Sequence, residues 1–190
     1  MATKKHTLVA LVSDRPGVLN RVASLFRRRG FNIDSIAVGH SETAGISRMT
    51  IVVDGNNTSV EQVRKQLDKV PDIVKLSDIT GDDTVARELS LIKVRTTTGT
   101  RSEIVEIVNI FRANIVDVAA DSLTIEATGD EDKIDSLFNL LRGFGIKEMA
   151  RTGCIAMTRG ERGALPVEDK AGNLKNMKCY SRIKKTKDSF

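Results

Sequence analysis

The sequence of 190 residues contains no tryptophan, one tyrosine, two cysteines and two histidines, and each scarcity excludes a class of site. Cys154 and Cys179 lack the paired spacing of a disulfide framework. His6 lies in the N-terminal arm and His40 in a polar loop, which argues against a shared metal site or a Ser–His dyad. The apolar runs are also far shorter than the ~18 residues that a membrane-spanning helix needs.

Catalytic and phosphate-binding motifs are missing too. Neither GxxxxGKS/T nor GxGxxG occurs in the sequence. The adjacent Asp82 and Asp83 are more typical of a solvated loop than of a paired acid and base. Residues 1–5 lack the apolar core of a signal peptide, so we expect a cytoplasmic protein. Nothing in the sequence indicates an enzyme that acts alone.

The net charge of +5 is concentrated at the C-terminal end. Residues 161–190 hold eight Lys and Arg against four Asp and Glu, which gives +4, whereas residues 1–160 are close to neutral. Because residues 161–190 show no sustained periodicity, we interpret them as a basic flexible tail. A basic tail alone is weak evidence for nucleic-acid binding.

The chain is organised around the stretch from Val9 to Leu19, which predicts a buried strand, a sharp turn and the start of a helix. Gly17 lets the backbone approach a ligand closely. The amides of Gly17, Val18 and Leu19 would be free donors at the helix N-terminus, where a carboxylate can bind. Asp14 could hold an ammonium group, so the turn offers both parts of an amino-acid site. The alternative is ordinary capping, with Asp14 as the N-cap.

The rest of the sequence repeats one pattern twice. The first half predicts strands at 9–12, 31–38, 46–53 and 73–79, with a helix after the first strand and another after the third. A polar linker is expected at 80–86. The second half predicts strands at 89–94, 115–119, 123–127 and 146–157, with helices in the same two places. We therefore predict an α+β fold of two tandem ferredoxin-like βαββαβ sandwiches, with domains at 1–80 and 81–160.

Two surfaces of this predicted fold point to partners. A four-stranded sheet with both helices on one face leaves its other face bare, and Thr50 and Val52 would lie there. Because bare faces and edge strands are usually covered by another subunit, we expect a homodimer. Arg27, Arg28 and Arg29 close the first helix, where cations suit the helix dipole. They either stabilise the helix and aid solubility, or form a partner-binding patch.

Two other functions use the same topology. RNA-binding RRM domains need aromatic residues on the open sheet face for base stacking. Here Phe26, Phe111 and Phe138 are predicted on helix faces that point to the core. Acylphosphatase uses an arginine in the first turn together with an asparagine, and Arg15 and Asn32 could take these parts. No glycine-rich phosphate cradle follows, so an acylphosphatase-like enzyme is kept only as the alternative.

Several stretches together resemble one family. The turn Ser13-Asp-Arg-Pro-Gly-Val-Leu19, followed by Phe26 and Arg29-Gly-Phe-Asn-Ile33, resembles an ACT domain, the amino-acid-sensing module. Residues 25–33 with Ser47-Arg-Met-Thr-Ile51 are similar to the small subunit of acetolactate synthase. In the second half, residues 87–94, 110–118 and 150–160 resemble that family's C-terminal domain. The resemblance covers residues 7–160.

This resemblance implies a non-catalytic regulatory subunit. Small subunits of this family bind and activate a catalytic large subunit, which uses thiamine diphosphate, Mg and often FAD. They also confer feedback inhibition by a branched-chain amino acid, commonly valine. The reaction joins two pyruvates, or pyruvate and 2-oxobutyrate, in the synthesis of valine, leucine and isoleucine.

The resemblance also implies where the effector binds. Two ACT domains pair side by side, and each effector site uses residues of both protomers. By position these are Asp14, Gly17, Val18 and Leu19 of one protomer with Asn32 and Ile33 of the other. Asp14 stands where family members often have asparagine. Arg29 matches an arginine associated with activation of the large subunit, which favours the partner-binding reading of the arginine triplet.

Overall fold

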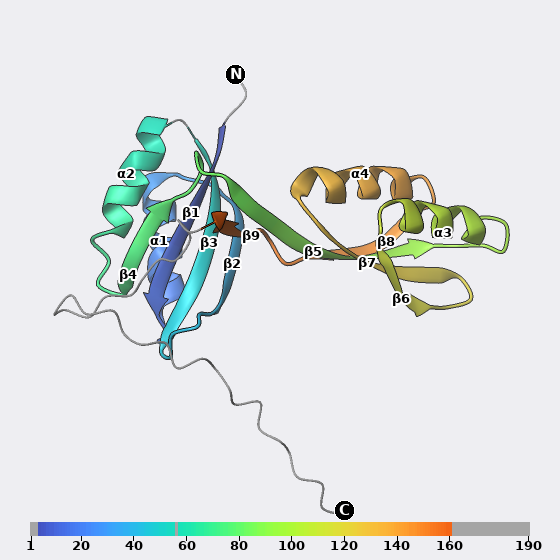
Figure 1. Cartoon of the computed structure of the whole chain (residues 1–190), viewed down its shortest axis with the longest axis horizontal. Helices are drawn as coiled ribbons and strands as arrows, with labels where there is room; N and C mark the ends of the chain where they lie inside the picture. Colours follow the sequence, from blue (N-terminus) through green and yellow to red (C-terminus); the bar gives the residue numbers. More distant parts are fainter. Residues whose placement is uncertain (1–3, 56, 161–190) are drawn as a thin grey trace, which may run out of the picture.

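The computed structural model describes residues 4–55 and 57–160 and arranges them in two units joined by one long strand (Figure 1). The first unit contains β1 (Lys4–Ser13), α1 (Val18–Arg29), β2 (Ile33–His40), β3 (Ile46–Gly55), α2 (Asn57–Leu67) and β4 (Ile73–Asp78). The second contains β5 (Thr84–Arg95), α3 (Arg101–Ile110), β6 (Asn114–Val118), β7 (Ser122–Gly129), α4 (Glu131–Arg142), β8 (Ile146–Arg151) and β9 (Ile155–Thr158). The order confirms the two predicted βαββαβ units. The tail predicted at 161–190 lies outside the described residues.

The first unit is an antiparallel sheet in the order β2-β3-β1-β4 with both helices on one face (Figure 1). Alternate residues of β1 point towards the helices, so Leu8 and Val12 pack in one core with Val22 and Phe26 of α1. These side chains are almost fully buried. The spacing of Val22 and Phe26 is the i, i+4 stripe that the sequence predicts for a core-facing helix.

The second unit repeats this design with the sheet order β6-β7-β5-β8. Its core consists of Ile92 on β5, Ile125 on β7, Ile104 on α3 and Ile134 on α4, all with no exposed surface. Asp130 caps α4, because its carboxylate accepts a hydrogen bond from the Lys133 backbone N–H at 2.9 Å. In the described part of the chain, no helix is both long and apolar enough to cross a membrane.

The connection between the units differs from the prediction. The expected linker at 80–86 is shorter, because β5 already begins at Thr84. The expected last strand at 146–157 is broken into β8 and β9, and Gly153 between them has a φ of +81°. The first part of β5, Thr84–Arg87, pairs with β9, whereas the remainder pairs with β7 and β8. We call Thr84–Arg87 with Ile155–Thr158 the β5–β9 ribbon.

The β5–β9 ribbon packs on the first unit. Ala156 of β9 forms a small core with Val9 of β1 and Ile79. As a result Thr50 and Val52 are only 2% and 7% exposed, so the prediction that this sheet face is bare within one chain was wrong. The alternation of β1 and β3 does put both residues on the face away from the helices, but a segment about a hundred positions further along the chain covers it.

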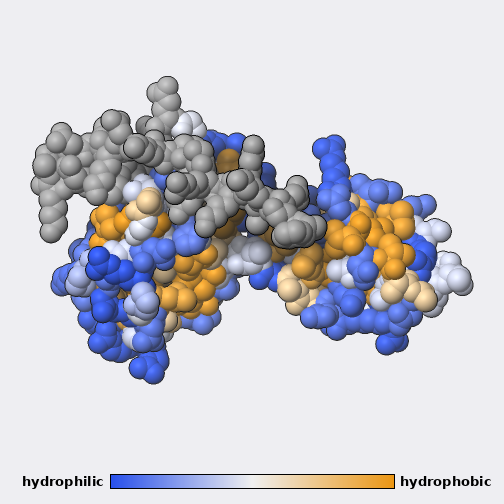
Figure 2. All heavy atoms as spheres, turned by 90° about the horizontal axis from the view of Figure 1, so that it is seen from below, coloured by the Kyte–Doolittle hydropathy of each residue, from blue (hydrophilic) through white to orange (hydrophobic). Residues whose placement is uncertain are grey.

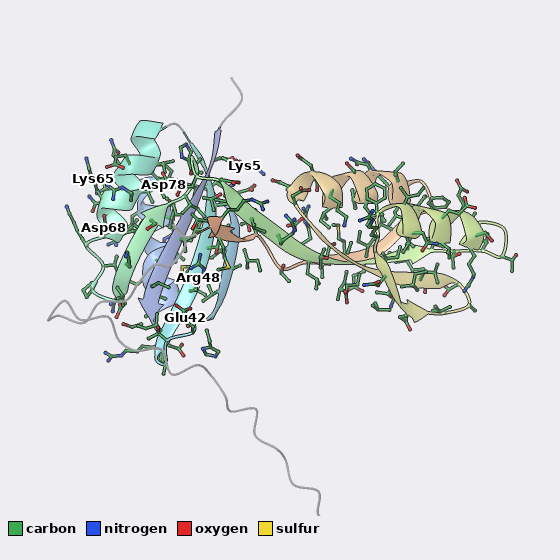
Figure 3. All side chains as sticks on the ribbon, in the orientation of Figure 1. Lys5, Glu42, Arg48, Lys65, Asp68 and Asp78 are labelled. Atoms are coloured by element: carbon green, nitrogen blue, oxygen red, sulfur yellow. The ribbon has the colours of Figure 1, made fainter. Side chains whose placement is uncertain are left out.

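Polar contacts join the units at the same place. The Cys154 backbone N–H donates to Ser35 Oγ at 2.8 Å. Lys5 Nζ lies 2.6 Å from Glu131 Oε1 of α4 and 2.9 Å from Asp34 Oδ2 of β2. The hydrogen bond to Glu131, followed by the one to Asp34, raises the pKa of Lys5 above its usual value. Figure 3 shows Lys5 on the side of the first unit that faces α4.

Candidate functional site

The predicted site begins at the turn between β1 and α1. The helix starts at Val18, and its N-cap is Gly17 with a φ of +87° and a ψ of −10°. No side chain accepts a hydrogen bond from the first turn of α1. Asp14 is therefore not the N-cap, so the capping alternative was wrong for Asp14, although Gly17 does lie in the turn, as that alternative also has it. The left-handed conformation explains why glycine occupies position 17, since other residues adopt it at a cost.

The space in front of this turn is open. A Cβ at Gly17 would meet no atom within 4 Å. Val18 N–H reaches only Arg15 O, at 3.5 Å, which is a weak contact. Helix N-terminal amides without an acceptor attract anions, because the helix dipole places partial positive charge there. Gly17, Val18 and Leu19 therefore present backbone amides to which a carboxylate could bind. Leu19 adds a half-exposed apolar side chain beside them.

Asp14 is held beside this turn by its own backbone. Its N–H donates to Gly45 O at 2.9 Å, which ties the turn to the loop between β2 and β3. The Asp14 carboxylate is half exposed and lies 3.3 Å from Nδ1 of His40, the last residue of β2. Sequence analysis gave His40 no role. The strand order is the signal that could have identified His40 as the neighbour of Asp14. β1 and β2 both pair antiparallel with β3, so they run in the same direction and finish at the same end of the sheet.

Asn32 and Ile33 lie elsewhere in the same chain. They follow α1, which has 12 residues and separates them from Gly17 by about 18 Å along its axis. Asn32 is exposed and Ile33 is partly buried against the core of the first unit. One chain does not bring these two residues to the Asp14 turn.

The same separation bears on the acylphosphatase-like alternative. Arg15 lies in the turn before α1, and Asn32 lies beyond its other end. The structure therefore does not bring together the two residues on which that alternative depends. Among the described residues, no group of three or more His, Cys, Asp or Glu is arranged to hold a metal ion.

Arg29 is the last residue of α1 and is exposed together with Arg27 and Arg28. None of the three forms an ion pair with a described residue. The helix ends at Gly30, whose φ of +70° allows its N–H to return to Arg27 O. The three cations at the C-terminal end of α1 are therefore free of ion pairs with the described residues. This is consistent with both interpretations of the triplet, helix stabilisation and partner binding.

The second unit provides an internal comparison for the turn. Its corresponding helix, α3, has Thr100 as N-cap, and Thr97 and Thr100 are hydrogen-bonded to each other across the turn. Arg101, the first residue of α3, donates through Nη2 to Ala119 O at 2.8 Å and Ala120 O at 3.0 Å. No side chain caps the first turn of α3 either, but its Arg101 N–H donates to Thr97 O at 3.1 Å, whereas the Val18 N–H of α1 has only the weak contact with Arg15 O.

Comparisons with known proteins agree with the two-unit description. The AHAS small subunit-like ACT domain family matches residues 8–75, and the small subunit of acetolactate synthase family matches residues 87–160. The chain is 51% identical over 163 residues to the acetolactate synthase small subunit of Mycobacterium bovis, covering 86% of this chain and 97% of the relative.

Two further comparisons point the same way. The acetolactate synthase small subunit of Bacillus subtilis is 51% identical over 158 residues, covering 82% of this chain and 91% of the relative. The crystal structure of the small subunit from Thermotoga maritima superposes with a TM-score of 0.77 at 44% identity, covering 82% of this chain and 98% of that one.

Proposed function

Because the chain belongs to the family of acetolactate synthase small subunits, we propose that it activates a catalytic large subunit and makes that subunit sensitive to a branched-chain amino acid, with valine as the first candidate. In this proposal the chain itself carries out no chemistry. Thiamine diphosphate, Mg and FAD belong to the large subunit, and the complex works in the cytoplasm. The observation that carries the proposal is the open turn at Gly17 with Asp14 beside it.

The turn can recognise both charged groups of an amino acid. The amides at the start of α1 donate hydrogen bonds to the carboxylate, and the Asp14 carboxylate accepts hydrogen bonds from the ammonium group. Leu19 supplies apolar surface for a branched side chain. His40 lies close enough to Asp14 to orient its carboxylate. A ligand with only one of these charges would leave part of the site unsatisfied, which favours amino acids over simple anions.

A second copy of the chain completes the site in this proposal. Asn32 and Ile33 lie about 18 Å along α1 from Gly17, so they reach the effector only from another protomer. β2 pairs with β3 alone among the described strands, so one of its edges is free for a partner. Pairing through β2 gives a homodimer with two effector sites, and an effector that contacts both protomers favours one geometry of their interface.

Reconstitution tests the proposal. The purified chain is added to the catalytic subunit, and acetolactate production is measured with and without valine. We expect no product from the chain alone, higher activity of the mixture and inhibition by valine. Activity of the large subunit that does not change on addition of the chain would contradict the proposed function.

Asp14→Ala tests the placement of the effector. Losing a hydrogen bond to a charged group costs about 1.5–3 kcal/mol, so calorimetry should show valine binding weakened by about ten- to a hundredfold. Asp82→Ala, in an exposed loop between the units, is the matched control and should bind valine as the unmodified chain does. Equal affinity in both variants would contradict the site at Asp14.

A further inference from the structure

A second cavity lies on the opposite face of the first sheet from α1. Its volume is about 330 Å³, and it is an open groove bounded by residues of β2 and β3 on one side and by the β5–β9 ribbon on the other. Ala37 and Gly39 of β2 form part of its wall, and their small size leaves the space open. The volume is at the lower end of the range for small-molecule sites. His40 also lines this cavity, and its Nδ1 lies 3.3 Å from the Asp14 carboxylate, so the cavity adjoins the turn before α1 without including the amides of Gly17.

The two arginine side chains in the lining of this cavity have no carboxylate beside them in that lining. Arg48 and Arg87 both line it, and its lining contains no Asp or Glu. Arg48 Nη2 donates to Ala156 O at 2.9 Å, and Arg87 Nη1 donates to Ala86 O at 2.7 Å. Neither arginine forms an ion pair with a described carboxylate. Figure 3 shows Arg48 on the first unit beside the ribbon.

Partial burial makes the Arg48 charge costly. Burial lowers the pKa of Arg48, and the charge of Glu42 opposes this only in part. A cation removed from water without a counter-charge gains from an anion at hydrogen-bond distance, and a guanidinium group can bind both oxygens of a carboxylate. The geometry of the cavity therefore favours a carboxylate between Arg48 and Arg87.

The remaining lining is suited to a short aliphatic body. Val38, Ile155 and Met157 line the cavity and are 49%, 59% and 60% exposed. Figure 2 shows that apolar residues reach the surface of both units. Thr50 also lines the cavity and is 2% exposed, and it supplies a hydroxyl that can donate a hydrogen bond. An occupant that covers the apolar side chains and accepts a hydrogen bond from Thr50 would satisfy both.

We propose that this cavity binds a short aliphatic 2-oxo acid, whose carboxylate pairs with Arg48 and Arg87 and whose keto oxygen accepts from Thr50. The corresponding amino acid is rejected, because its ammonium group would lie beside two cations with no carboxylate in the lining. The ligand contacts β2, β3 and β9 together, so it strengthens the docking of the ribbon on the first sheet. This site does not depend on valine binding at Asp14 or on a catalytic subunit.

Calorimetry with the full chain tests this proposal, with 3-methyl-2-oxobutanoate as the probe. We expect saturable binding at millimolar concentrations or below. Arg48→Met should weaken it by about ten- to a hundredfold, the loss expected for a charge-assisted hydrogen bond. Valine should not displace the probe, and Arg142→Ala should bind the probe with unchanged affinity, because Arg142 ends α4 in the second unit and does not line the cavity.

Arg48 also donates a hydrogen bond to Ala156 O, so Arg48→Met could disturb the ribbon itself. A second variant tests the cavity without removing that bond. Gly39→Val fills the cavity and leaves both arginines in place, since a Cβ at Gly39 meets no atom within 4 Å and its φ is not left-handed. It should abolish probe binding, whereas Gly81→Val, at an equally open glycine outside the cavity, should not. The proposal is overturned by absence of saturable binding to the unmodified chain, by binding that survives both Arg48→Met and Gly39→Val, or by displacement of the probe with valine.

Discussion

Gly153→Ala should weaken the contact between the two units. Gly153 has a φ of +81°, and a Cβ there would lie 2.8 Å from Ser35 Oγ and 3.2 Å from Ile36 O. The left-handed conformation costs about 1–2 kcal/mol for alanine. Overpacking costs about 1–3 kcal/mol more, because Ile36 O is backbone of β2 and cannot rotate away. The expected loss of stability is therefore about 2–5 kcal/mol.

Gly45→Ala is the matched control. Gly45 has a φ of +76°, but a Cβ there meets no atom within 4 Å, so only the backbone cost applies. The melting temperature of Gly153→Ala should be lower than that of Gly45→Ala by roughly 2–12 °C. This is the difference expected for about 1–3 kcal/mol of overpacking in a chain of this size. Hydrogen exchange at the Cys154 amide should also be faster in Gly153→Ala, because its bond to Ser35 is lost first. Equal melting temperatures would refute the close contact at Gly153.

Three further predictions follow from other parts of the chain. Arg29→Ala should reduce activation of the catalytic subunit in the reconstituted assay, whereas Arg142→Ala, at the last residue of α4, should not; equal activation by both would remove Arg29 from the partner surface. Burial, with the charges of Glu88 and Glu131, raises the pKa of the Cys154 thiol. In a Cys179→Ser chain, iodoacetamide at pH 8 should therefore react more slowly with the folded protein than with the urea-unfolded protein. Glu131→Gln should speed hydrogen exchange in the β5–β9 ribbon in low salt more than in high salt, and a salt-independent effect would show that the pair with Lys5 does not hold the units together.

Local sequence patterns predicted most of the fold. Phe26 on the core face of α1 and the three arginines that close this helix were both recognised from the sequence, and the helix does end at Arg29. The repeat of the same order in both halves gave the two units. These features depend on residues close to one another in the sequence, so they can be recognised without knowledge of tertiary contacts.

The junction between the units could not be predicted in this way. Residues 84–87 contain two charged or polar side chains and two small apolar ones, which is typical of a linker, and only their pairing with β9 makes them a strand. The break between β8 and β9 at Gly153 depends on the left-handed φ of that glycine, which its residue type permits but does not fix. The turn at Gly17 was recognised, but the neighbour of Asp14 was not, because His40 reaches it only through the shared register of β1 and β2 with β3.

β2 connects the features that give this chain its proposed regulation. Ile33 begins the strand, Ser35 accepts the bond from Cys154 of the second unit, and His40 ends the strand beside Asp14. All three lie on eight consecutive residues of one strand. Packed strands resist bending, so a ligand that moves either end of β2 also moves the contact at Ser35. An effector bound at Asp14 of one protomer and Asn32 of its partner would therefore act on the second unit directly through this strand, and the second unit needs no amino-acid site of its own to respond.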